Sequence, residues 1–367
     1  MGQNLYLHGF RGLLAFLLLV FHVANSGLPT FTGQFYEPFH FLLLSFEHGV
    51  ELFFGISGIV ILSAFGKSKT IYSFMLNRAT RILPVLWVCI SVIIFLSFFQ
   101  SDKKIDLDVM VVIANLLCLP PAVPVQMIHP ASWTLCYEFM FYSLFILLAI
   151  PNTVLGKNLR IWILGALAIF LLMVFPRSWC FLAGVIVFRY VHPEKCTSRI
   201  FDYSGIFIFL SFLIWHQINE YLNVHGLNAS SAFIHYVSVE YTVWLQFLAF
   251  AFAFLGLAGV FLGRGLLSKF LLTQTMQFLG TISYSLYLWQ TITMAIVKFV
   301  MKKLGMVEHT AEWSQLVFFI LVVPPTLIVS YISQRLIEDK LTNALRHRFK
   351  MKPHQSMPDM TQDRPAK

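Results

Sequence analysis

The sequence predicts an all-α fold: a polytopic bundle of about ten transmembrane helices with both termini in the cytoplasm. Three observations predict it. Hydrophobic residues make up 58% of the 367 residues. Charged residues make up only 12%, about half the share found in soluble domains. Apolar runs also recur along the chain, from about residue 5 to residue 334.

Each run is long enough, or nearly so, to cross the bilayer as a helix, because a span needs about 20 residues at a rise of about 1.5 Å each. In order, the runs are 5–25, 46–65, 82–100, 133–150, 159–175, 178–192, 204–221, 240–262, 278–298 and 313–334. The fifth and sixth are the least clearly separated, since only FPRSW lies between them. We interpret the first run as a retained span rather than a cleaved signal peptide, because apolar segments continue along the chain.

Lysine and arginine predict the orientation. With the N-terminus inside, the inner segments hold 20 of the 26 Lys and Arg residues and the outer loops hold six. This asymmetry follows the positive-inside rule and indicates an even number of spans. We therefore expect one transmembrane domain over 1–340, followed by a basic, disordered cytoplasmic tail over 341–367. Topology accounts for most of the net charge of +9, so we expect membrane lipid and no nucleic acid as a partner.

The five cysteines are odd in number and form no C-x-x-C pair. Most fall in apolar runs, where cysteine behaves as a small hydrophobic residue. The pattern predicts neither a disulfide framework nor a metal site.

Two outer loops, about 26–45 and 101–132, are long and contain several prolines. Long loops in a compact bundle are usually binding loops or lids, with plain connectors as the alternative. Three histidines lie in or next to these loops: His40, His48 and His129. They are within reach of a ligand on the outer side, but we expect solvated side chains.

The first run contains an arginine and a histidine, in RGLLAFLLLVFH. Eleven residues advance a helix by about 1,100°, so Arg11 and His22 project from one face, roughly 16 Å apart along the axis. Ionisable side chains in spans normally face the bundle interior or a watery cavity, which indicates one cavity lined at two depths. Imidazole is a suitable general base near neutral pH, whereas guanidinium binds anions or orients a partner. The alternative is that His22 hydrogen-bonds within the bundle while Arg11 extends to the inner interface.

Four further charged residues are candidates. Arg78 and Arg81 lie one helical turn apart on the inner side and, taken alone, are interpreted as topological anchors. Glu138 lies about two turns into the fourth run, and Glu51 has a similar place on the second. A carboxylate near the first turn of a helix is also favoured by the helix dipole alone.

Six segments, taken together, resemble a known family. They are RGLLAFLLLVFH (11–22), GVELFFGISGIVI (49–61), LNRATRILP (76–84), SWTLCYEFMFYS (132–143), GTISYSLYLWQ (280–290) and YISQRLIE (331–338). In order and spacing they are similar to the motifs of the membrane acyltransferase-3 family and cover roughly residues 5–340. Members are bacterial integral-membrane enzymes that O-acylate, usually O-acetylate, cell-surface carbohydrates.

The resemblance implies an acyltransferase that transfers groups other than aminoacyl groups and lies in the bacterial inner membrane as a multi-pass protein. The donor would be acetyl-CoA or another acyl-CoA, with no permanently bound cofactor and no metal. The acceptor would be a hydroxyl of a surface, exported or lipid-linked carbohydrate, such as an exopolysaccharide or a lipopolysaccharide O-antigen.

The resemblance also implies roles for the candidate residues. His22 would act as general base or as a transient acyl carrier. Arg78 and Arg81 would hold the CoA phosphates, because arginine binds phosphate through paired, charge-assisted hydrogen bonds. The catalytic set is His22, Arg11 and Glu138, with Arg11 also on the donor side and Glu138 orienting His22 or holding the sugar. Weaker candidates for substrate binding are Glu51, Trp133, Tyr137 and Tyr284.

Three positions depart from the family pattern. His8 replaces the acid that often precedes the signature arginine by three residues, Gln290 replaces a histidine, and the proline expected after Glu338 is missing. Gln290 is therefore not expected to carry a proton. The main alternative function is a secondary transporter or exporter that uses Arg11 and His22 for ion or proton coupling, although we see no internal repeat of the kind such proteins often carry.

Overall fold

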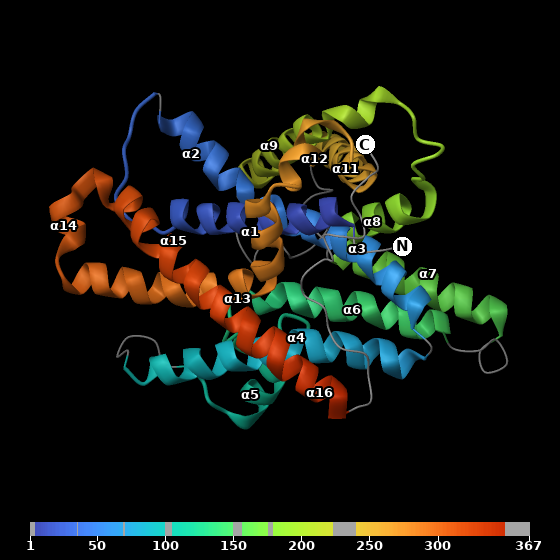
Figure 1. Ribbon diagram of the computed structural model, residues 1–367, viewed down its shortest axis with the longest axis horizontal. Helices are drawn as coiled ribbons and strands as arrows, with labels where there is room; N and C mark the ends of the chain where they lie inside the picture. Colours follow the sequence, from blue (N-terminus) through green and yellow to red (C-terminus); the bar gives the residue numbers. More distant parts are fainter. Residues whose placement is uncertain are drawn as a thin grey trace. The chain divides into compact units, whose positions relative to one another are not determined.

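The computed structural model describes residues 4–34, 36–68, 70–99, 105–149, 156–174, 179–222 and 240–348. Within these ranges every regular element is a helix, and each of the ten predicted apolar runs coincides with one (Figure 1). Six helical segments of the described residues are long and apolar enough to cross a membrane. They are Leu5–Ala24, Tyr36–Lys67, Ile71–Ser97, Arg199–Leu222, Thr242–Leu262 and Met306–Arg348. The all-α, polytopic class is confirmed, whereas the count of ten spans and the cytoplasmic termini stay predictions.

The chain forms two compact units from interleaved segments. Unit 1 contains 1–43, 76–136 and 273–367, and unit 2 contains 44–75 and 137–272. The elements lying wholly or mostly in unit 1 are α1 (Leu5–Ala24), α2 (Tyr36–Ser45), α4 (Ile71–Ser97), α5 (Val109–Leu116), α13 (Gln274–Lys303), α14 (Met306–Thr310), η5 (Ala311–Trp313), α15 (Ser314–Ser333), η6 (Gln334–Leu341) and α16 (Thr342–Arg348). Those of unit 2 are η1 (Phe46–His48), α3 (Gly49–Lys67), α6 (Ser132–Ala149), α7 (Lys157–Val174), α8 (Trp179–Tyr190), η3 (Arg199–Tyr203), α9 (Ser204–Leu222), α11 (Glu240–Leu262) and α12 (Gly265–Leu271).

In unit 1, α1 packs along α13. Asn4 caps α1, since its side chain accepts a hydrogen bond from the Leu7 N–H at 3.1 Å. The two helices meet backbone to backbone, because a Cβ added at Gly12 would collide with the Gly280 backbone. They run parallel: His8 contacts α13 near its start, and Lys298 near its end donates to the Ser26 carbonyl. Beyond α13, α14 leads the chain into α15, which packs back on α13 (Figure 1).

In unit 2, α3 and α8 cross in the same manner. A Cβ added at Gly184 would collide with the Gly55 carbonyl oxygen. Beside the crossing, the ring of Phe181 stacks between Phe54 and Phe141, with centroid distances of 4.6 and 4.2 Å. The helices α9 and α11 lie side by side along most of their length (Figure 1).

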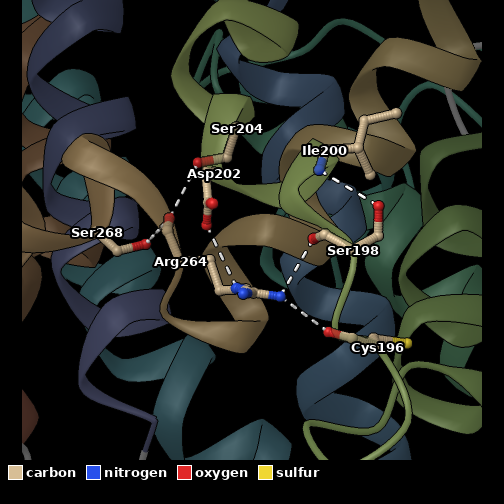
Figure 2. Close-up of polar contacts among 7 residues, drawn as sticks. All are labelled: Cys196, Ser198, Ile200, Asp202, Ser204, Arg264 and Ser268. Carbon is tan, nitrogen blue, oxygen red and sulfur yellow. Dashed lines mark hydrogen bonds and ion pairs between the residues drawn. The ribbon is translucent and has the colours of Figure 1, made fainter.

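Arg264 fixes the segment between α8 and α9 to the turn between α11 and α12 (Figure 2). Its Nη1 donates to the carbonyls of Cys196 and Ser198, each at 3.1 Å, and its Nε lies 3.3 Å from Asp202 Oδ1. In the sequence, Arg264 is one of the 20 inner Lys and Arg residues that predict the orientation. In the structure, its guanidinium N–H groups bind other residues of the chain.

The predicted loops and tail contain more helix than expected. Loop 26–45 contains α2, and loop 101–132 contains α5. Loop 26–45 is also tied to α15, because Tyr36 donates to Gln315 Oε1 at 2.9 Å and the backbone N–H of Gln315 donates to the Pro29 carbonyl at 3.1 Å. Helical structure extends to Arg348, beyond the expected start of the tail at residue 341, and residues 349–367 lie outside the described ranges.

Candidate functional site

Arg11 and His22 lie on one face of α1, because the helix is continuous from Leu5 to Ala24. Both side chains are partly exposed. Ala15 and Leu18, which lie between them on the same face, are 0% and 1% exposed. Along this face, the side chains between the two ionisable residues are buried by packing. Only Arg11 and His22 keep solvent-accessible surface.

The imidazole of His22 makes no hydrogen bond within the described residues, and its one described ring contact is with its neighbour Phe21, at 4.9 Å between centroids. The interpretation of His22 as a side chain hydrogen-bonded within the bundle finds no support in this part of the chain. His22 therefore stays a candidate for contact with a substrate.

Arg11 has an acidic partner that comes from the far end of the sequence. Glu338 of η6 is 4% exposed and interacts electrostatically with Arg81 and Arg11. Ser285 of α13 donates to Glu338 Oε1 at 2.6 Å and so fixes the carboxylate. His8, which stands where relatives often have an acid, contacts the Gln277 carbonyl instead, at 3.2 Å. Sequence reasoning missed Glu338, although an acid close to an apolar run is a visible signal.

Two further arginines, Arg78 and Arg346, lie close to Arg81. Arg78 is only 9% exposed, which is unusual for a charge that serves topology alone. Arg346 of α16 donates to the Asn77 carbonyl at 3.3 Å and interacts electrostatically with both Arg81 and Arg78. Arg81 thus connects the two arginines at its sides, Arg11 through Glu338 and Arg346 directly, while the adjacent Asp339 is 3.9 Å from Arg335. The cluster, which we call the arginine cluster, consists of Arg11, Arg78, Arg81 and Arg346. Its excess positive charge favours a bound anion.

Tyr284 and Trp133, also of unit 1, occupy structural positions. Tyr284 donates to the Ile82 carbonyl at 2.7 Å and so joins α13 to the turn of α4 that carries Arg81. Trp133 is buried at the start of α6. Next to it, the Thr134 hydroxyl lies 3.1 Å from the Tyr287 hydroxyl.

Gln290 is a further polar group in the interior of unit 1. It is 0% exposed, and neither its amide nitrogen nor its amide oxygen has a hydrogen-bond partner within the described residues. Because α1 and α13 run parallel, with His8 beside Thr281 and Ser26 beside Lys298, Gln290 lies at a depth between Arg11 and His22. A buried amide with both atoms unpaired is costly, which favours a ligand that supplies both a donor and an acceptor.

In unit 2, Glu138 and Glu51 occupy different environments. Glu138 is partly exposed and accepts a hydrogen bond from Ser57 at 3.1 Å. Tyr137 beside it is buried, with its ring 5.9 Å from that of Phe54. Glu51 is also buried, and its Oε1 lies 3.4 Å from His48 Nδ1. Glu51 is therefore not an exposed interfacial carboxylate.

The expectation of solvated loop histidines is wrong for His48 and His129, which are both buried. His129 Nε2 donates to the Leu288 carbonyl and its Nδ1 accepts from the Ala131 N–H, each at 3.1 Å. These two bonds require the neutral ring, and burial lowers the pKa of His129 to about 4. His40 is partly exposed and contacts the Ala24 carbonyl at 3.2 Å.

These features describe a helical membrane protein whose α1 carries an arginine and a histidine, the histidine without a hydrogen-bond partner among the described residues, and a cationic cluster at the arginine's end. The family model described as an acyltransferase domain matches residues 4–335. The chain therefore belongs to the acyltransferase-3 family, and it is an acyltransferase that transfers groups other than aminoacyl groups.

One curated relative is the exopolysaccharide production protein ExoZ of Rhizobium meliloti (strain 1021). It is 26% identical over 261 residues, which cover 68% of this chain and 77% of the relative. No solved structure matches the chain.

Proposed function

We propose that the protein is an O-acetyltransferase, or an O-acyltransferase of a longer acyl group, in the bacterial inner membrane. It takes the acyl group from cytoplasmic acyl-CoA and transfers it to a hydroxyl of an exported or cell-surface polysaccharide. Family membership and the name of the ExoZ relative support this choice of reaction and acceptor. The observation that carries the proposal is the imidazole of His22, partly exposed and without a hydrogen-bond partner in the described structure, on the face of α1 that also presents Arg11.

The arginine cluster supports acyl-CoA as the donor. CoA carries several phosphates, and guanidinium groups bind phosphate through paired, charge-assisted hydrogen bonds. A close group of like charges is unfavourable by itself, and a bound polyphosphate would reduce the repulsion. Arg78 and Arg81 would hold the phosphates, with Arg11 at the entrance to the interior of unit 1.

Gln290 fits the arm of the donor. The pantetheine arm contains secondary amides, each with one N–H and one C=O, and a side-chain amide can pair with both at once. At its depth on α13, Gln290 would position the arm so that the thioester carbonyl approaches His22.

His22 would supply the chemistry. As general base, it takes the proton from the acceptor hydroxyl while the oxygen attacks the thioester carbonyl, and it then returns that proton to the departing CoA thiolate. In the second form of the mechanism, a ring nitrogen attacks the thioester first, and the acyl group passes from His22 to the hydroxyl. Both forms release CoA–SH and the acylated sugar.

On the acceptor side, Glu138 is the strongest candidate of unit 2. Its carboxylate is partly exposed and already oriented by Ser57, so it can accept hydrogen bonds from sugar hydroxyls. Tyr137 and Trp133 would contribute apolar surface, and Tyr284 would act only through its hold on α4.

The test is mass spectrometry of the surface polysaccharide from a strain that lacks the gene. Wild-type protein should restore the lost acyl mass, the variant His22→Ala should not, and the exposed-histidine control His347→Ala should behave as wild type. A polysaccharide whose mass is the same with and without the gene would refute the proposed acceptor. Normal acylation by the expressed His22→Ala variant would remove His22 from the mechanism, and proton-coupled export without acylation would favour a transporter.

A further inference from the structure

A row of four titratable side chains lies within unit 2, away from the residues assigned above to the donor. Its members come from two places: His48 and Glu51 from η1 and α3, and His216 and Glu220 from α9. From the surface inwards, the order is Glu220, His216, His48 and Glu51. The Glu220 side chain is 46% exposed, whereas those of His216, His48 and Glu51 are 4%, 1% and 2% exposed.

Successive members are neighbours in space, and the contact between His48 and Glu51 is within hydrogen-bond distance. Glu220 Oε1 lies 3.8 Å from His216 Nε2, and His48 Nδ1 lies 3.4 Å from Glu51 Oε1. The rings of His216 and His48 are 6.3 Å apart between centroids, a gap that one hydrogen-bonded water spans. Trp215 stacks on His48 at 6.1 Å and covers one face of the ring.

His48 is the link between the two halves of the row. Its Nδ1 faces Glu51, whereas its Nε2 is buried and has no hydrogen-bond partner in the described part of the chain. A buried ring nitrogen without a partner is costly unless a proton or a water reaches it. Because the ring lies against Trp215 and His216, the supply comes from α9.

We propose that Glu220, His216, His48 and Glu51 form a proton relay between water at the end of α9 and the buried carboxylate of Glu51. A proton from water binds Glu220 and passes to His216 Nε2, and His216 releases its Nδ1 proton. One water carries that proton to His48 Nε2, and the His48 Nδ1 proton passes to Glu51, which becomes a neutral carboxylic acid. Each imidazole gains one proton and loses one, so the charge that enters at Glu220 is the charge that neutralises Glu51.

The surroundings of the row are mostly apolar or neutral. Glu47 of η1 adjoins His48 in the sequence and Tyr221 of α9 adjoins Glu220, and both side chains are titratable. On α11, which packs against α9, the buried polar side chains Thr242 and Gln246 are neutral. Chains of acid and histidine in membrane proteins are a typical means of moving protons, because each member accepts and donates in turn.

Proton transfer along the relay does not depend on the proposed function, but the role of the relay in acyl transfer rests on that function. A transferase that removes a proton from a hydroxyl and returns one to a thiolate exchanges protons with both reactants. A route from Glu51 to water would let the protein bind or release a proton as the reaction proceeds.

The test needs no substrate. Purified protein in lipid nanodiscs is stepped to lower pH, and the carboxylic C=O stretch of newly protonated acids is followed by time-resolved infrared spectroscopy. The variant Glu51→Gln should remove one component of this signal. The variant Glu220→Gln, at an exposed position that tolerates the change, should leave the amplitude of that component and slow its appearance by about tenfold. His216→Gln should slow it similarly, and the exposed control Glu194→Gln should not.

An unchanged rate in Glu220→Gln would overturn the relay, and so would a signal that Glu51→Gln leaves intact. Either result leaves the acyltransferase proposal standing, because no donor or acceptor is present. Conversely, loss of the polysaccharide acyltransferase assignment would not change the infrared result.

Discussion

The two units organise buried charge in opposite ways. In unit 1, Arg11 and Arg81 lie near the carboxylate of Glu338, and Arg346 lies near Arg81 and Arg78, so like charges lie close together. Unit 2 places its acids beside hydrogen-bond donors, with Glu51 next to His48 and Glu138 next to Ser57. A cluster of like charges is stable only with a counter-ion from outside the chain, whereas neighbouring acids and donors satisfy each other. The proposed anionic donor therefore belongs with unit 1.

The packing of the two units is nearly the same, which makes the chemical difference clearer. Both rely on a crossing of two helices at glycine, Gly12 against Gly280 in unit 1 and Gly55 against Gly184 in unit 2. Small residues at such crossings let helix backbones touch in a membrane. The contrast between the units lies in the polar groups and not in the helical framework.

The largest expected effect tests whether the chemistry belongs to unit 1. His22→Ala should lower kcat for acyl transfer by about 10³-fold or more, because general-base catalysis contributes about 10²–10⁴-fold and an acyl carrier would be lost entirely. The measurement is acyl transfer from radiolabelled acetyl-CoA in vesicles, with His347→Ala as the control. A kcat within a few-fold of wild type would contradict the assignment.

The next effect tests the shared packing. Gly184→Val places a side chain against the Gly55 carbonyl and should destabilise unit 2 by about 3 kcal/mol or more, since overpacking forces the backbone apart. Gly165→Val on α7 is the matched control, because no atom lies within 4 Å of a Cβ added there. Thermal unfolding in detergent and the yield of monodisperse protein report the result, and equal Tm values for the two variants would argue against a close crossing.

A smaller effect tests the buried acid Glu338, which lies next to the arginine cluster. Glu338→Gln keeps an acceptor for Ser285 but removes the charge near Arg11 and Arg81, so repulsion in the arginine cluster should rise. We expect kcat/KM to fall about 10²-fold, because breaking a buried charge pair leaves the remaining charges uncompensated. Steady-state kinetics give the value. The conservative variant Glu338→Asp should retain more activity than Gln, and the reverse order would show that charge is not the relevant property.

Stability at low pH tests the neutral ring of His129. Its pKa is about 4 in the folded protein and near 6.5 when unfolded, so between these values the unfolded chain binds a proton that the folded protein does not. Folding stability should therefore fall as pH decreases, by about 2 kcal/mol between pH 7 and pH 5. The measurement is Tm against pH for wild type and His129→Gln. Parallel curves for the two proteins would contradict a buried neutral His129.

The smallest effect concerns the donor phosphates. Replacing both Arg78 and Arg81 with glutamine should raise the KM for acyl-CoA by about tenfold with a modest change in kcat, because Arg11 and Arg346 remain. The exposed pair Lys302 and Lys303, replaced likewise, provides a control of equal charge. If KM stays constant while insertion or yield falls, the two arginines are topological anchors.

Apolar periodicity was enough to predict the helices, because each run of the chain must satisfy its own backbone in lipid. It was not enough for the polar contacts, which join distant residues. Glu338 reaches Arg11, and Arg346 reaches Asn77, and neither pairing leaves a local pattern in the sequence. Loop composition also misled for His129, since the prolines around it indicate exposure, whereas the ring is buried and bonds to the Leu288 carbonyl of α13.

The backbone contact between Gly12 and Gly280 limits how α1 can move. Two helices in such contact cannot slide past one another without separating, and hydrogen bonds from Gln277 to the Leu5 carbonyl and from Lys298 to the Ser26 carbonyl hold the two ends of the same pair. The height of His22 relative to α13 is thus set by the framework. An acyl group that crosses the membrane beside His22 would therefore move past a fixed α1. It would not be carried across by a rocking motion of that helix.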